Sequence, residues 1–134
     1  MNNIEKFEFC TVQILNELCT SFPIPTVIVV REIAPDYKND GSIEDQDVLE
    51  IYTNTMHFLK SEGYLKTNNN ESADSTIFRG CVLTSKGLSA LHRVPAPLRD
   101  SKSLMEQLSD VKSSGIATAS KAMIGGIVKA FLAS

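Results

Sequence analysis

The chain has 134 residues, enough for one hydrophobic core with an appendage, and its 43% apolar and 22% charged residues are ordinary for a globular protein. The net charge of −3 is unevenly placed, because residues 1–95 carry 8 Lys/Arg against 13 Asp/Glu, whereas residues 96–134 carry 5 against 3. An acidic body of this kind argues against a protein built around nucleic-acid binding.

Apolar residues recur at three- and four-residue steps from Ile4 to Phe22, which predicts an amphipathic first helix ending before Pro23. The β-branched run at 26–30 has the propensity of a strand. Helical character resumes directly after it, and a helix-turn-helix order needs a short second helix at this point. We therefore predict a helix over roughly 26–34, with a strand as the open alternative.

The next helix is predicted over 42–62. Ser42 can cap its N-terminus, with Asp45 at the capping-box position, and Gly63 is a typical C-terminal stop. The preceding residues 35–41 have the composition of a loop.

A β-hairpin with a long polar connection is predicted over 64–83. Thr84 can then cap a closing helix that ends at Pro95, and Leu83 and Leu88 occupy the positions of a hydrophobic staple. The expected fold is mainly α with a small β-hairpin, in which a winged helix-turn-helix domain at 1–95 precedes a helical extension at 96–134.

The extension is predicted to form a short helix near 104–111 and a strongly apolar helix over 116–134, whose two charges are Lys121 and Lys129. Small residues stand four apart along this last helix: Thr118, Ala122, Gly126, Ala130 and Ser134. A helix apolar over most of its circumference must be buried, and a small-residue ridge permits close helix approach. We expect it to pack on its own domain or on a sister subunit, with membrane contact as the alternative.

Two junctions resemble those of bacterial winged-helix domains. The segment FLKSEGYL at 58–65 resembles their junction of helix, glycine and strand, and LTSKGLSAL at 83–91 resembles the turn from the second wing strand into the following helix. MarR-like and PadR-like regulators carry such L-T-x-K-G junctions. The resemblance covers roughly 4–95 and is specific for fold. It implies a possible DNA-binding regulator that dimerises through helices outside the winged core.

The predicted recognition helix is poorly suited to DNA. Its first turns carry Glu44, Asp45, Asp47 and Glu50, and the hairpin connection 68–75 has no Arg or Lys. Acids facing phosphates weaken the sequence-independent part of binding, so an acidic solvated face is favoured over a DNA-reading one. The residues that would face DNA on this fold are these: Asn54, His57, Lys60, Lys66 and Arg79.

No enzyme, metal or cofactor is expected. The two histidines, His57 and His92, lie on separate predicted helices, and the cysteines have no close pair. We interpret the cysteines as small buried hydrophobic residues in a reducing cytosol.

We therefore expect a non-enzymatic winged-helix protein that self-associates or binds a protein partner through its C-terminal helices. The interaction helix would present these residues: Ala122, Met123, Gly126, Ile127, Ala130 and Phe131. One alternative is a transcriptional regulator that binds DNA through helix 42–62 and the 64–83 wing. A second is a membrane-associating adaptor that uses helix 116–134. The first residues lack the basic flank and apolar run of a signal peptide, so a cytoplasmic location is expected.

Overall fold

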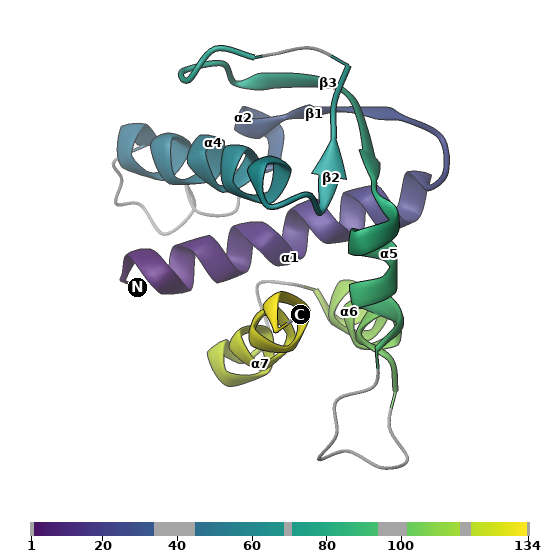
Figure 1. Ribbon diagram of the computed structural model, residues 1–134. Coiled ribbons are helices and arrows are strands. Elements are labelled where there is room, and N and C mark those ends of the chain that lie inside the picture. Colours follow the sequence, from purple (N-terminus) through teal and green to yellow (C-terminus); the bar gives the residue numbers. More distant parts are fainter. Residues whose placement is uncertain (1, 34–44, 69–70, 94–101, 116–118, 134) are drawn as a thin grey trace.

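The computed structural model describes residues 2–33, 45–68, 71–93, 102–115 and 119–133. Within them the chain is mainly helical, with a small three-stranded antiparallel sheet (Figure 1). The helices are α1 (Asn3–Ser21), α2 (Val30–Ile33), α4 (Asp45–Ser61), α5 (Ser85–His92), α6 (Leu104–Ser114) and α7 (Lys121–Leu132). The strands are β1 (Thr26–Val29), β2 (Leu65–Lys66) and β3 (Ile77–Leu83), in the order β1-β3-β2.

Helix α1 is the central element of the core. Asn2 and Glu5 form a capping box at its start, in which each side chain accepts a hydrogen bond from the other residue's backbone N–H. In Figure 1, α4 lies on one side of α1, and α7 lies on the other. Its apolar side chains are almost completely buried along most of its length, from Cys10 to Leu18.

The helix expected over 26–34 is wrong in its first half. Residues Thr26–Val29 form β1, which pairs antiparallel with β3, and only Val30–Ile33 turn into the short helix α2. Branching at Cβ restricts these side chains in a helix and suits the pleated strand. Strand propensity and the pairing with β3 thus outweigh the helix that a helix-turn-helix order requires at this point.

Helix α4 ends as the sequence predicts. Gly63 adopts a left-handed φ of +83°, and its N–H donates to the carbonyl of Lys60 at 3.0 Å, while the N–H of Tyr64 donates to the carbonyl of Leu59 at 3.0 Å. This is the paired pattern of a Schellman motif, and it sends the chain directly into β2. Ser42, the predicted cap at the other end of this helix, lies outside the described residues.

The hairpin and the closing helix are also as predicted. Leu65 on β2 lies opposite Leu83 on β3. The hydroxyl of Thr84 accepts from the N–H of Gly87 at 3.1 Å and donates to the carbonyl of Gly63, so that one side chain caps α5 and ties it to the end of α4. Pro95 lies outside the described residues.

Helices α6 and α7 share one hydrophobic core with the rest of the molecule. Leu108 of α6 and Phe131 of α7 are almost completely buried in the same cluster as the α1 side chains. The ring of Phe131 lies 4.5 Å from that of Tyr64, centroid to centroid. The guanidinium of Arg93 donates to the carbonyls of Phe131 at 2.8 Å and Ala133 at 2.7 Å, which stabilises the C-terminal end of α7.

Candidate functional site

The exposed side of α4 and the connection between β2 and β3 form one polar surface. Asn54 is exposed, and its side chain donates to the carbonyl of Glu50 at 2.9 Å, one turn earlier on the same helix. His57 lies edge-on to the ring of Phe78 at 5.2 Å, and its Nε2 is buried with no hydrogen-bond partner among the described residues. His57 is therefore packed against β3, with its Nε2 shielded from solvent.

Lys60 forms an ion pair with the connection. Its Nζ lies 2.9 Å from Oε1 of Glu71, whose side chain is only 5% exposed, and the hydroxyl of Thr67 donates to the same oxygen at 3.1 Å. Burial raises the pKa of Glu71, but the hydrogen bonds from Lys60, its own backbone N–H and Thr67 outweigh burial and hold that pKa below its usual value. The pair fastens the connection to α4 and neutralises the charge of Lys60.

The two other predicted cations lie elsewhere. Lys66 is exposed, whereas Leu65 beside it points into the core, and on β3 Arg79 is exposed beside the buried Phe78. Successive residues of a strand point to opposite faces, so both cations stand on the outer face of the sheet. The residues predicted to face DNA are therefore divided between α4, which carries Asn54, His57 and Lys60, and the sheet, which carries Lys66 and Arg79.

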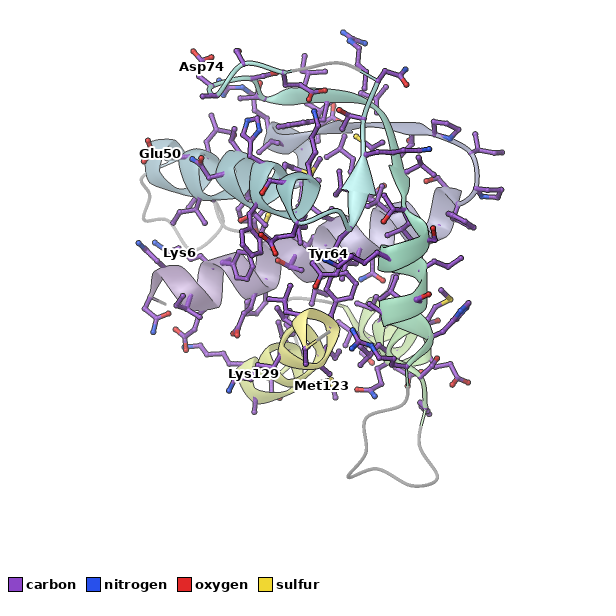
Figure 2. The ribbon with its side chains drawn as sticks, in the orientation of Figure 1. Lys6, Glu50, Tyr64, Asp74, Met123 and Lys129 are labelled. Carbon is purple, nitrogen blue, oxygen red and sulfur yellow. The ribbon has the colours of Figure 1, made fainter. Side chains whose placement is uncertain are left out.

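A cleft of about 380 Å³ opens between α4 and the last part of the connection. Its walls are formed by these residues: Leu49, Glu50, Thr53, Asn54, Ala73, Asp74 and Thr76. Figure 2 shows the two acids, Glu50 on α4 and Asp74 on the connection, at the same end of the molecule. The described lining contains no cation, which makes the cleft acidic. Sequence reasoning missed Asp74 because a short polar loop gives no indication of how it folds back.

Helix α7 divides into an inner and an outer side. Of the six residues predicted for an interaction helix, Ile127 and Phe131 are buried in the chain's own core, at 1% and 0% exposure. Ala122, Met123 and Gly126 face solvent, and Ala130 is half-buried. A Cβ added at Gly126 would meet nothing within 4 Å, so nothing among the described residues covers this strip. Figure 2 shows Met123 and Lys129 on α7, away from the sheet.

The described residues do not assemble a metal or nucleophile site. They include no group of three or more His, Cys, Asp or Glu side chains placed to hold a metal ion. Burial raises the pKa of the Cys10 thiol well above its ordinary value and that of Cys81 to about 11, so neither is a thiolate at neutral pH. None of the described helices combines the length and apolarity needed to cross a bilayer.

Comparison of the chain with protein-family models, with curated proteins and with solved structures found no match.

Proposed function

We propose that this chain is a non-enzymatic winged-helix module that works through protein contacts, self-association included, rather than by binding DNA. The winged-helix assignment draws support from the element order α1, β1, α2, α4, β2, β3 and from the sheet order β1-β3-β2. The two junctions that resemble winged-helix domains are each held by specific hydrogen bonds, those of the Schellman motif at Gly63 and those of the Thr84 cap.

The observation that carries the proposal is the acidic cleft. In a winged-helix domain α4 and the hairpin would be the elements that approach DNA. Here Glu50 and Asp74 line the space between them, and Lys60 is already paired with Glu71. Affinity for a duplex depends on cations that neutralise phosphates, and this surface presents carboxylates instead.

Exposed apolar side chains on α7 support binding to a protein partner in place of DNA. Met123 on α7 is 50% exposed, at the centre of the small-residue strip that includes Ala122 and Gly126. Small residues allow another helix to approach closely, and the inner side of α7 is already anchored in the core. The C-terminal helices would therefore complete the domain and at the same time offer a surface to a partner.

A duplex titration tests the negative half of the proposal. Random double-stranded DNA at about 20 mM salt is the most permissive condition for phosphate contacts. We expect no binding by the wild-type chain. The double variant E50Q/D74N, which removes the two acids of the cleft, serves as the matched control. Wild-type binding that weakens steeply with salt would establish the regulator alternative, in which Lys66 and Arg79 supply the phosphate contacts.

Sedimentation at increasing protein concentration tests the positive half. We expect the average mass of the full chain to rise above that of the monomer. The variant M123E places a charge on the outer strip of α7 at a residue that is not part of the core, and so reports whether that strip is the contact surface. A dissociation constant of about 1 mM corresponds to a free energy of dimerisation near −4 kcal/mol. If the chain is still a monomer at that concentration, self-association is removed from the proposal.

A further inference from the structure

An uncharged stretch runs along one edge of the sheet. Residues 18–30 contain no Asp, Glu, Lys or Arg, although the body of the chain is acidic. The stretch ends α1, makes the following turn and forms β1, which is an edge strand in the order β1-β3-β2. Proteins usually protect such edges with a charge, a proline or a bulge within the strand, and Thr26–Val29 has none of these.

The backbone of β1 presents hydrogen-bonding groups to the side on which no strand of the described residues pairs with it. The N–H of Val30 donates to the carbonyl of Thr76 at 2.9 Å, and Ile28 lies opposite Phe78, so the amides of residues 28 and 30 face β3. Amides alternate in direction along an antiparallel strand, which turns those of Val27 and Val29 to the opposite side.

The irregularity in the ladder does not disturb this alternation. Two steps along β1, from Thr26 to Ile28, correspond to three steps along β3, from Cys81 to Phe78. The extra residue therefore belongs to β3, where Gly80 has a φ of +68° that accommodates the bulge. The edge strand itself stays regular and able to pair.

Apolar side chains gather around the same edge. Of the seven large apolar side chains that are exposed in the described residues, three lie on this stretch: Phe22, Ile24 and Val27. Ile24 is 70% exposed and Val27 is 48% exposed. A group of this kind on one edge marks an interaction site rather than scattered surface residues.

We infer that β1 pairs antiparallel with β1 of a second copy of this chain, with Val27 opposite Val29 of the second copy. Antiparallel pairing of a strand with its own copy is what a twofold axis produces, so one edge supplies both sides of the contact. In this register the outward amide and carbonyl of each valine meet those of the other valine, and the two side chains form a cross-strand apolar pair.

Charge favours a second copy as the occupant. Each copy carries a net charge of −3, so two copies repel at most of their surfaces. The uncharged edge is where they can meet without placing like charges opposite one another. The pairing joins two three-stranded sheets into one continuous sheet. It rests on the self-association proposed above, and it places that contact at the β1 edge, which leaves the outer strip of α7 to a different protein partner.

Sedimentation of three variants locates the contact. V27K places a lysine on the edge at a half-exposed position, and dimerisation should weaken about tenfold or more, a change equivalent to about 1.4 kcal/mol. I77K is the matched control, because Ile77 is exposed on the same face but on the middle strand β3. I77K and M123E should dimerise like wild type.

Hydrogen exchange gives a second readout that does not depend on a variant. The amides of Val27 and Val29 should exchange slowly at high protein concentration and rapidly after dilution, because only the second copy protects them. The amide of Ile28 faces β3 and should be protected at both concentrations, which makes it an internal control.

The outcomes separate the two proposals. A wild-type dimer that survives V27K, or that M123E dissociates, overturns the β1 contact and leaves self-association standing. Exchange at Val27 and Val29 that is independent of concentration also overturns the β1 contact. A chain that is monomeric at every concentration overturns both proposals. Loss of the dimer in V27K alone supports both.

Discussion

Replacing Gly126 by alanine should stabilise the protein. Gly126 lies in the interior of α7 and is exposed, and a Cβ at that position would meet no atom within 4 Å. The substitution therefore removes the conformational freedom that glycine has in the unfolded chain and introduces no clash. Helix propensities place the gain at about 0.8–1 kcal/mol.

The neighbouring glycine provides the control. A Cβ at Gly125 would lie 3.2 Å from Oε1 of Glu8 on α1, so the end of that side chain must move before the same gain is realised. G125A should thus stabilise less than G126A, or not at all. The two variants have the same chemistry and sit one residue apart on one helix, and they differ only in what faces them.

Thermal and denaturant unfolding at low micromolar concentration provide the measurement, because at that dilution the proposed self-association would not contribute. An unfolding entropy of about 2.1 cal/mol/K per residue gives about 0.28 kcal/mol/K for 134 residues, so the Tm of G126A should rise by about 3–4 °C. An unchanged or lower Tm for G126A would refute the reasoning, as would an equal gain for G125A.

Three further predictions follow from single contacts. E71Q should lower the free energy of unfolding by about 1–3 kcal/mol at pH 7. Because Lys60 and Thr67 hold the folded-state pKa of Glu71 below the ordinary 4.5, this contribution is present above pH 4.5 and lost as pH falls through the folded-state pKa. Denaturant unfolding should therefore show that the difference in free energy of unfolding between wild type and E71Q becomes smaller in acid. A difference that does not change with pH would contradict the lowered pKa of Glu71. R93A should lower the free energy of unfolding by about 1–2 kcal/mol, because the guanidinium binds the final carbonyls of α7. Hydrogen exchange should then accelerate first in the last turn of α7, and unchanged exchange there would count against that role. A thiol reagent at pH 8 should modify the half-buried Cys19 before Cys81, whose pKa burial raises to about 11, as peptide mass spectrometry can check; the reverse order would contradict the described burial.

The features that the sequence predicts correctly are governed by neighbouring residues. The stop at Gly63 depends on the left-handed backbone that glycine adopts readily, and the cap at Thr84 depends on an amide three residues away. The two hairpin strands follow from alternation over a few positions. All of these depend on hydrogen bonds formed within a single turn or between adjacent strands.

The features that the sequence does not predict depend on distant partners. The β-branched run at 26–30 favours a strand, but the run alone does not specify the partner that makes it one, because Ile28 lies opposite Phe78, fifty residues further on. The Lys60–Glu71 pair and the acidic cleft depend on how a polar connection folds back over α4. Neither spacing nor composition specifies that path.

The apolar helix at the end of the chain was predicted to require a partner, and α1 provides much of the surface that its inner side covers. The apolar sequence of α7 shows that this helix must be buried, but it does not show which element covers it. Gly125 of α7 and Glu8 of α1 are far apart in the sequence and are brought together only by the tertiary fold. What remains of the small-residue ridge is the outward strip around Met123.

The position of α1 between α4 and α7 has a consequence for biosynthesis. Helix α1 leaves the ribosome before α4 and α7, the elements that cover its two sides. Contacts this distant in sequence are slow to form, because a long loop must close before they contribute. The side of α1 that α7 covers therefore stays uncovered on the nascent chain until α7 has been made. We expect that interval to be when this protein is most exposed to aggregation and most dependent on chaperones.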